Sequence, residues 1–172
     1  MIRVGILSDT HLYQDSALFK EQVAQAFEHC SVILHAGDLC HLALLEILAD
    51  QGRREVHAVH GNMCLFECQQ VLPSSKLITL ANTKIGLCHG AGGPRSTIEE
   101  RVWQLFPQAD CIVYGHSHQA TCHRSGGVLF INPGSFLSTG PYGDPGSYAI
   151  LTIDKQGLHG ALYHLPRRSP TA

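Results

Sequence analysis

The 172-residue sequence predicts an α/β fold, and three observations support that prediction. Apolar segments of strand length alternate with segments of helical periodicity over residues 2–62, the order that builds a parallel sheet with right-handed crossovers. From residue 76 onward, strand-like segments separated by Gly-rich turns predict β-hairpins. Polar residues with catalytic or metal-binding capacity follow directly on the apolar runs.

The first half of the chain predicts three strands and two helices. Apolar positions recur at helical spacing over residues 16–29, and a second helix is expected over residues 41–50, ended by Gly52. Apolar runs at residues 2–9 and 31–38 are typical of buried parallel strands, and residues 54–62 are predicted to form a third strand.

The second half predicts six strands and one helix. The helix covers residues 92–106 and has Pro94 near its start. The strands are expected at residues 76–82, 83–90, 109–118, 126–135, 146–154 and 157–165. Because no repeat or long linker interrupts these elements, we expect a single domain over residues 1–165 and a flexible tail at residues 166–172. The Gly- and Pro-rich segment 138–146 is expected to be a loop.

Composition and charge exclude several classes of protein. Apolar residues make up 44% of the chain and charged residues 15%, which is typical of a globular protein. The net charge of −2 gives no general attraction to nucleic acid or to an anionic membrane. The apolar runs fall far below the ~20 residues that span a bilayer, and no signal-peptide pattern is present. We therefore expect a cytoplasmic protein with no membrane segment and no clear nucleic-acid surface.

The numbers and spacing of the cysteines and histidines limit which kinds of metal or disulfide site are expected. The seven cysteines are odd in number and include no C-x-x-C pair, so neither a disulfide framework nor a thiolate zinc site is expected. We interpret them as small buried hydrophobic residues. The twelve histidines nearly equal Lys plus Arg in number, and histidine is the commonest metal ligand.

Metal-capable side chains follow five of the predicted strands. They are Asp9, His11, Asp38, Asn62, His89, His116 and His118. Because ligands bind outside the carboxyl ends of strands in an open α/β sheet, we expect these residues to meet at one edge. The D-x-H and H-x-H spacings would put both side chains on one face of an extended segment. Hard oxygen and borderline nitrogen donors suit Mn, Fe, Zn, Co or Ni better than calcium, and seven donors suit two ions.

These motifs, in this order, resemble the calcineurin-like metallophosphoesterases. The matching segments are Asp9-x-His11, Gly37-Asp38, Gly61-Asn62, His89-Gly90 and Gly115-His116-x-His118, and INPGS at residues 131–135 is similar to the small YfcE-like phosphodiesterase branch. The resemblance implies a four-layer α/β/β/α sandwich with two mixed β-sheets. It also implies a metal-dependent phosphodiesterase or phosphatase with a small phosphate-ester substrate and two divalent ions. Manganese is expected first, with nickel, iron, cobalt or zinc as alternatives.

The resemblance further implies residue roles. One ion would be held by Asp9, His11 and His118, the other by Asn62, His89 and His116, with Asp38 bridging both. A bridging hydroxide would attack phosphorus in line, so Asp38, Asn62 and His89 are the predicted catalytic residues. Asn62 is also expected to bind a phosphate oxygen. Arg95 is a candidate phosphate clamp, with a solvated helix-start residue as the alternative interpretation.

The sequence departs from the family pattern at Met63-Cys64, directly after Asn62. In many relatives a histidine at the first of these positions is thought to protonate the leaving group, and a general acid contributes roughly 10²–10⁴-fold. Met63 cannot donate a proton, so we expect better activity on aryl or activated esters than on simple alkyl esters. His41 and His123 are weak candidates for a replacement donor, while His35 and His60 are interpreted as supporting residues behind the ligands.

Two other functions compete with a phosphoesterase. A non-catalytic, metal-binding scaffold of the retromer-subunit type is the main alternative, although all seven matching positions here hold competent donors. A nuclease is disfavoured because the chain has neither a basic patch nor an added nucleic-acid-binding domain. Homo-oligomerisation stays open, since small members of this branch often associate.

Overall fold

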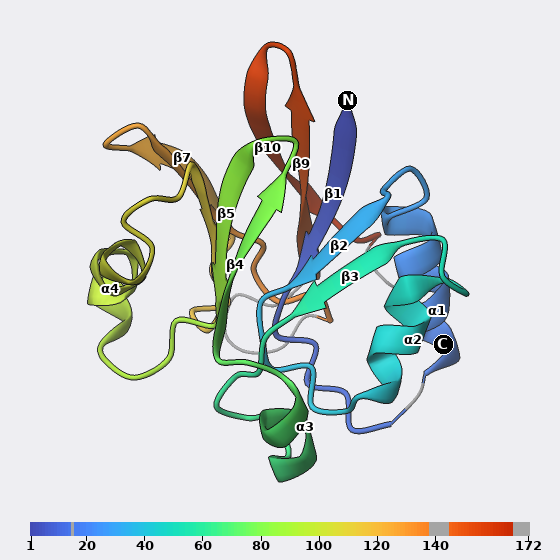
Figure 1. Cartoon of the computed structure of the whole chain (residues 1–172). Helices are drawn as coiled ribbons and strands as arrows, with labels where there is room; N and C mark the ends of the chain where they lie inside the picture. Colours follow the sequence, from blue (N-terminus) through green and yellow to red (C-terminus); the bar gives the residue numbers. More distant parts are fainter. Residues whose placement is uncertain (15, 138–144, 167–172) are drawn as a thin grey trace.

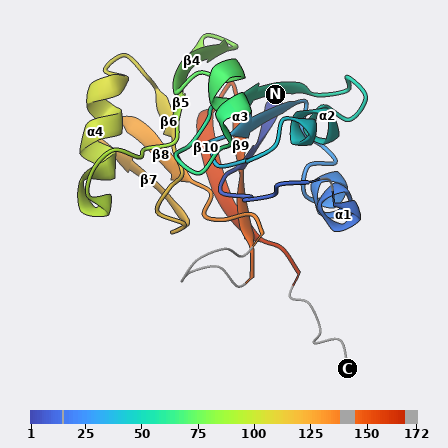
Figure 2. The same cartoon turned by 90° about the horizontal axis from the view of Figure 1, so that it is seen from below.

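Two five-stranded mixed sheets pack face to face, with helices against both outer faces (Figures 1 and 2). The computed structural model describes residues 1–14, 16–137 and 145–166. The predicted four-layer α/β/β/α sandwich is confirmed. The predicted loop at 138–146 and the predicted tail at 166–172 lie outside the described residues, apart from positions 145, 146 and 166.

The first sheet has the strand order β10-β9-β1-β2-β3. Strands β1 (Ile2–Leu7), β2 (Val32–His35) and β3 (Glu55–Ala58) are parallel, as predicted, and their register pairs Leu7 with His35 and His35 with Ala58. Their carboxyl ends are therefore level with one another. The hairpin of β9 (Ser147–Asp154) and β10 (Gly157–His164) adds antiparallel strands beside β1.

The second sheet has the strand order β4-β5-β6-β8-β7. Its bounds are β4 Ser75–Leu80, β5 Thr83–Cys88, β6 Cys111–Val113, β7 Thr121–Ser125 and β8 Val128–Asn132. Strands β5, β6 and β8 are parallel, while β4 and β7 pair antiparallel at the two edges. Strand β7 was not predicted, because its sequence, TCHRS, is mostly polar and three of its five residues are exposed.

Two of the three predicted helices begin and end near the predicted positions, whereas the helix predicted over residues 92–106 begins later, at Ile98. Helix α1 (Ala17–Ala26) begins after Ser16, whose hydroxyl accepts the Phe19 N–H at 3.3 Å and so caps a free amide. The other elements are α2 (Ala43–Ala49), α3 (Phe66–Val71), the 3₁₀ turn η1 (Arg95–Thr97) and α4 (Ile98–Leu105). Helix α3 was not predicted, since it spans six residues and leaves Phe66 and Val71 exposed.

Alternating side chains of the strands divide the core into three parts. Ile6 and Leu34 point between the two sheets, whereas their neighbours Leu7 and Ile33 point outward under α1 and α2. A third cluster, which includes Ile112, lies under α4. All seven cysteines are free thiols and six are buried, which matches their interpretation as small hydrophobic residues. Among the described residues, no helix is long and apolar enough to cross a membrane.

Candidate metal centre

The seven predicted ligands lie just beyond the carboxyl ends of β1, β2, β3, β5 and β6. The strands of this group that Figure 1 labels run toward the lower half of the view. Three of the five strands belong to the first sheet and two to the second. The prediction of one sheet edge is therefore wrong in this respect, because the ends of two packed sheets meet instead. A hydrogen bond from His89 Nδ1 to the carbonyl of Ala36, 2.8 Å long, crosses from one sheet to the other.

The ligand loops bend at the ligands themselves. Five of the seven have a left-handed backbone: Asp9 (φ 53°), His11 (φ 49°), Asp38 (φ 56°), His116 (φ 67°) and His118 (φ 61°). Asp and His adopt this conformation more readily than most residues with a side chain. The reasoning from an extended D-x-H segment was therefore wrong, because left-handed turns aim these side chains. The Asp9 N–H donates to the Gly37 carbonyl at 3.0 Å, which ties two ligand loops together.

A first donor group consists of Asp9, His11 and His118. Asp9 Oδ1 lies 3.1 Å from His118 Nε2 and 3.8 Å from His11 Nε2, and the two Nε2 atoms are 3.3 Å apart. The other carboxylate oxygen, Oδ2, accepts the Ser8 hydroxyl at 2.6 Å and the His116 N–H at 3.1 Å. These two bonds orient the buried carboxylate so that Oδ1 faces the histidines. The three ligand atoms can thus converge on one ion.

A second donor group consists of Asp9, Asp38 and His89. Asp38 Oδ1 accepts the Met63 N–H at 2.8 Å, while Oδ2 lies 3.2 Å from His89 Nε2. Because the Ala36 carbonyl can only accept, His89 Nδ1 carries the hydrogen, and in the neutral ring Nε2 presents a lone pair. A lone pair 3.2 Å from a carboxylate oxygen needs a positive charge between them, either a proton or a metal ion. The residues therefore fit a divalent cation.

Burial and charge set the protonation of these groups. Burial alone would lower the pKa of His89, but the hydrogen bond with Asp38 and the charges of Asp9 and Asp38 outweigh it and raise the pKa. Burial opposes ionisation of both carboxyls, yet hydrogen bonds and the nearby His89 charge lower the pKa of Asp9 and of Asp38. Both carboxylates are thus ionised at neutral pH, as metal ligands must be.

Two other histidine ligands, His11 and His116, favour the neutral form. Burial lowers the pKa of His11 and of His116. The charge of His89 and that of Arg95 lower the pKa of His116 further. Neutral imidazoles at these two positions have lone pairs that can bind a metal.

Asn62, His116 and Arg95 surround the two donor groups. The His116 ring packs edge-on against His89, with ring centroids 5.1 Å apart. Asn62 is exposed and, together with His89, lines a cavity of about 570 Å³. Arg95 is exposed and lines a smaller cavity of about 230 Å³ with Ser117. The described structure thus groups the ligand atoms of Asp9, His11, Asp38, His89 and His118, and places Asn62 and His116 beside them.

The INPGS segment supports the ligand loops, a role that its sequence did not reveal. The amide of Asn132 donates to the Gly115 carbonyl at 2.9 Å and to the Ser117 hydroxyl at 3.0 Å, fixing the loop that carries His116 and His118. The Ser135 hydroxyl donates to the Asp9 carbonyl at 2.9 Å. The sequence feature that could have indicated this supporting role is a polar segment with Pro and Gly at the end of a buried strand.

His35 lies behind the ligands, as predicted. It is fully buried, and its Nδ1 accepts the Gly37 N–H at 3.3 Å, so Nε2 donates to the Thr10 hydroxyl at 3.3 Å. Burial lowers the pKa of His35 to about 4, which keeps the ring neutral. The ring therefore connects the two loops that carry Asp9 and Asp38.

Two glycines allow the ligands to approach the backbone closely. A Cβ at Gly37 would lie 2.5 Å from His89 Nδ1, and a Cβ at Gly61 would overlap the carboxylate of Asp38. Any side chain at either position would displace a ligand. The predicted close backbone approach beside Asp38 and Asn62 is thus observed.

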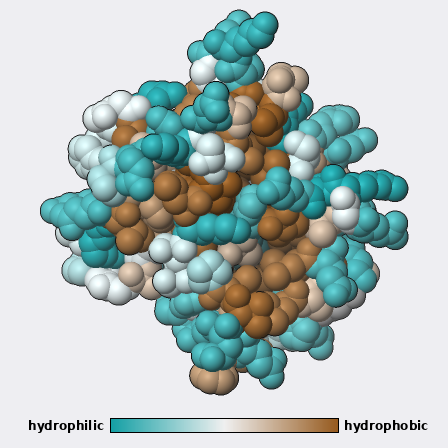
Figure 3. Space-filling model, in the orientation of Figure 1, coloured by the Kyte–Doolittle hydropathy of each residue, from teal (hydrophilic) through white to brown (hydrophobic). Residues whose placement is uncertain are grey.

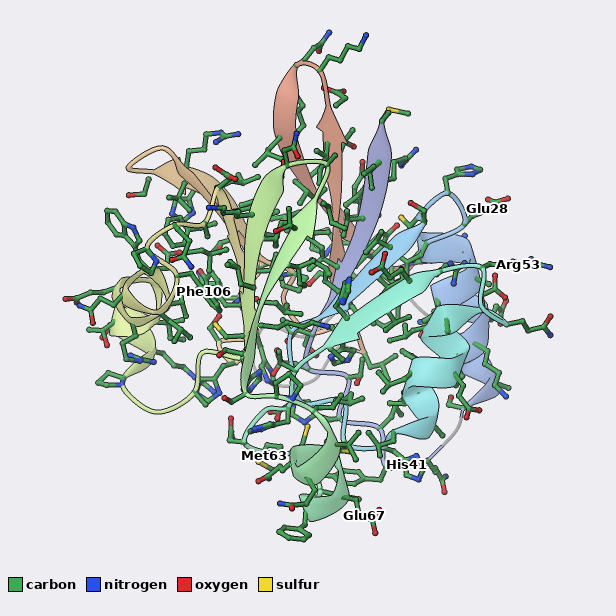
Figure 4. The ribbon with its side chains drawn as sticks, in the orientation of Figure 1. Glu28, His41, Arg53, Met63, Glu67 and Phe106 are labelled. Carbon is green, nitrogen blue, oxygen red and sulfur yellow. The ribbon has the colours of Figure 1, made fainter. Side chains whose placement is uncertain are left out.

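Neither Met63 nor Cys64 supplies a proton donor to the centre. Met63 lies at the strand-end side of the molecule, as Figure 4 shows, and its side chain is half exposed. Cys64 is buried and its sulfur accepts the Gly61 N–H at 3.3 Å. His41 accepts the Ala43 N–H at 3.1 Å at the start of α2, and His123 stacks on Phe130 and contacts Glu99. Neither weak candidate for a replacement donor contacts the ligands through these interactions.

Comparisons with known proteins agree with this geometry. The family model of the calcineurin-like phosphoesterase superfamily domain matches residues 2–156. A probable metallophosphoesterase of Methanothermobacter thermautotrophicus is 34% identical over 159 residues, which cover 90% of this chain and 88% of the relative. Among solved structures, a predicted phosphoesterase of Streptococcus pneumoniae has the same fold, with 22% identity, a TM-score of 0.74, and coverage of 95% of this chain and 89% of that one.

A second similar solved structure is that of Vps29, whose name does not describe a phosphoesterase. Vps29 of Entamoeba histolytica, in complex with Zn²⁺, is 25% identical, with a TM-score of 0.70 and coverage of 95% of this chain and 99% of that one. The family match covers most of the chain, and a relative above 30% identity extends over nearly its full length. The chain belongs to the calcineurin-like phosphoesterase superfamily.

Proposed function

We propose that the protein is a two-metal phosphoesterase that hydrolyses phosphate esters, diesters first, by in-line displacement at phosphorus. One observation carries this proposal: two donor groups of mixed oxygen and nitrogen atoms share Asp9 and lie at the meeting point of two sheets. Shared carboxylates and neighbouring imidazoles are the ligand types that dinuclear hydrolase sites use. The family match supports the reaction class.

The donor set supports transition metals rather than calcium. Asp9 and Asp38 supply hard oxygens, and His11, His89, His116 and His118 supply borderline nitrogens. When bound, two divalent ions would supply Lewis acidity and lower the pKa of water, which in-line phosphoryl displacement requires. We propose manganese first, with nickel, iron, cobalt or zinc as alternatives.

The chain's own residues orient these ligands and the ester. We propose that Asp9, His11 and His118 hold one ion, that Asn62, His89 and His116 hold the other, and that Asp38 bridges them. Asp9 belongs to both donor groups, because its Oδ1 also lies 4.0 Å from His89 Nε2. The distances therefore support a refinement in which Asp9 is close to both ions. The Ala36 carbonyl keeps the hydrogen of His89 on Nδ1, leaving Nε2 to bind.

Two polar side chains are proposed to bind the ester. Asn62 stands at the wall of the cavity next to His89, where its amide can donate to a phosphoryl oxygen. Arg95 is exposed and close enough for its charge to lower the pKa of His116, so its guanidinium can neutralise phosphate charge from the other side. No proton donor replaces Met63 among the contacts described above, which supports a preference for esters with good leaving groups.

Hydrolysis assays with defined metal loading test the proposal. Protein treated with a chelator and reloaded with Mn²⁺ should hydrolyse bis(p-nitrophenyl) phosphate faster than p-nitrophenyl phosphate, and chelated protein should hydrolyse neither. Asp38→Asn should lower the rate at least 100-fold, since it removes a ligand charge. Glu28→Gln removes one charge from an exposed side chain away from the site and serves as the matched control (Figure 4). Equal loss in both variants, or turnover in the presence of chelator, contradicts the proposal.

A scaffold function is the second candidate. The likeness to Vps29 supports it, because that protein shares the fold and holds Zn²⁺. It is disfavoured because all seven ligand positions here carry competent donors and five of them converge. Metal binding without metal-dependent hydrolysis of either ester would favour the scaffold over the enzyme.

The cellular compartment, the substrate class and the oligomeric state are further parts of the proposal. Seven free thiols in the described structure support a reducing, cytoplasmic compartment. We propose a small phosphate ester as the partner, with homo-oligomerisation still open. Size-exclusion chromatography with light scattering measures the oligomeric state directly.

A further inference from the structure

A cavity beside the metal centre is larger than a phosphate group requires. It has a volume of about 570 Å³, and the residues that line it include His89, Asn62, and Arg101, Val102 and Leu105 of α4. From this arrangement we infer that the cavity binds a neutral, mainly apolar group of the ester, best filled by an aromatic ring. The inference rests on the proposed phosphoesterase function and names the substrate class: aryl esters of phosphate.

The walls of the cavity favour an apolar occupant. Val102 is buried and belongs to the core under α4, and Leu105 of the same helix is 51% exposed. Figure 3 shows apolar side chains at the centre and toward the lower end of the face of the molecule drawn in Figure 1. Apolar surface that is exposed beside a reactive centre gains free energy when an apolar ligand covers it.

The charges around the cavity exclude a cationic occupant. Of the described residues that line it, none is Asp or Glu, whereas Arg101 is a cation. A positively charged group would therefore face Arg101 and the two metal ions without a compensating carboxylate. A neutral group would be repelled by neither Arg101 nor the metal ions. The phosphate itself would be bound by the metal ions and Asn62.

Arg101 is fixed in a way that suits an aromatic ring. Its Nη1 donates to the Pro94 carbonyl at 2.8 Å and to the Thr97 hydroxyl at 2.6 Å, and its Nη2 donates to the Gly90 carbonyl at 2.9 Å. These three bonds hold the planar guanidinium in one orientation, and such planes stack on aromatic faces. Gly90 follows His89 directly, so the same bonds connect α4 to a metal ligand.

The size of the cavity agrees with this assignment. Small-molecule sites measure about 300–1,000 Å³ and are mostly apolar with a few polar groups. The polar side chains that line this cavity are His60, Asn62, Ser74, Ser75, His89 and Arg101. Val102 and Leu105 of α4 add apolar side chains to the same lining.

Calorimetry with two phosphonates tests the inference independently of turnover. Phenylphosphonate and methylphosphonate have the same anionic head and differ only in the group that would enter the cavity. The Mn²⁺-loaded protein should bind phenylphosphonate about tenfold or more tightly than methylphosphonate. Leu105→Ser should reduce that ratio about fivefold, because it removes apolar contact area. Leu105→Met keeps an apolar side chain and should preserve the ratio.

A matched control distinguishes loss of contact in the cavity from the effect of replacing any exposed leucine by serine. Leu77 is 40% exposed on β4 and does not line the cavity, so Leu77→Ser should leave the ratio unchanged. Equal affinity for the two phosphonates in the wild-type protein, or an unchanged ratio in folded Leu105→Ser, overturns the inference. If the binding ratio is as expected but no metal-dependent hydrolysis occurs, the inferred site stands and the proposed function fails.

Discussion

His89 Nε2 and Asp38 Oδ2 lie 3.2 Å apart at the point where the two sheets meet. The hydrogen bond from His89 Nδ1 to Ala36 leaves both facing atoms as acceptors when the ring is neutral. A proton stabilises this pair in the absence of metal, and a divalent ion can take its place. The pair therefore couples the metal affinity of the site to pH.

The first prediction concerns this coupling. The pKa of His89 is raised above its ordinary value of 6.5, so in metal-free protein the ring should remain protonated at pH values where exposed histidines are neutral. NMR of the imidazole nitrogens should show His89 titrating above 6.5, and Zn²⁺ should abolish that titration. Metal affinity should fall as the pH is lowered through the pKa of His89. A His89 pKa below 6.5 contradicts the prediction.

The same pair gives a prediction about stability without metal. A group whose pKa is raised by folding stabilises the protein below its unfolded pKa and loses that contribution as the pH rises through the folded pKa. The free energy of unfolding of metal-free wild type, relative to His89→Asn, should therefore decrease as the pH rises from 6.5 through the raised pKa of His89. Urea unfolding of both proteins across this range measures it. A difference that grows with pH is incompatible with the proposed pairing.

A third prediction compares two glycines with positive φ. Gly37→Ala places a Cβ 2.5 Å from His89 Nδ1, whereas Gly52→Ala, also at positive φ, meets no atom within 4 Å. Both variants should lose ~1–2 kcal/mol of stability from backbone strain. Gly37→Ala should in addition lose metal affinity, because His89 must move. Thermal unfolding and Mn²⁺ titration distinguish the two effects, and equal metal affinity in both variants contradicts the assigned role of Gly37.

A fourth prediction concerns Asn132. Asn132→Ala removes the bonds to the Gly115 carbonyl and the Ser117 hydroxyl that fix the loop of His116 and His118. Loss of such supporting bonds typically lowers metal affinity about 10–100-fold. Asp110→Ala also removes a side-chain hydrogen bond to the backbone, from the Lys84 N–H at 2.8 Å, but at the start of β5 and outside both the ligand loops and the INPGS segment. Similar loss of metal affinity in both variants would show that Asn132 acts only through general stability.

A fifth prediction concerns the missing proton donor. Because Met63 cannot protonate a leaving group, the rate should fall steeply as the pKa of the leaving group rises. Met63→His should raise the rate on an alkyl ester by at least tenfold and change the p-nitrophenyl ester little, since a general acid contributes roughly 10²–10⁴-fold. Rates over a series of esters measure this dependence. A flat dependence in the wild-type protein rejects the idea.

The sequence predicted most strands and the candidate ligands, but it did not predict how the two sheets and the ligand loops come together in space. Continuous apolar runs identified β1 and β2, because parallel strands buried on both sides carry few polar residues. The polar β7 and the six-residue α3 have no such pattern, so they were missed. Left-handed φ values at Asp9 and His11 accompany backbone bonds to the distant loop of Gly37 and Asp38, which local spacing does not encode.

The supporting residues were harder to predict than the ligands. Asn132 and Ser135 were visible as a motif, but their contacts to Gly115 and Asp9 arise only when β8 packs beside β6 and its following loop reaches β1. Arg101 had no signal, because an arginine in an amphipathic helix is usually solvated. Its role follows from three acceptors supplied by the preceding loop and turn.

The central claim is that one chain holds two divalent ions and uses both in ester hydrolysis. Mn²⁺ should be titrated into chelated protein, with bound metal measured by elemental analysis and hydrolysis of bis(p-nitrophenyl) phosphate measured on the same samples. We predict that activity rises as the second equivalent binds and reaches its maximum at two ions per chain. Full activity at one ion per chain, or no metal-dependent activity at any loading, would contradict the account.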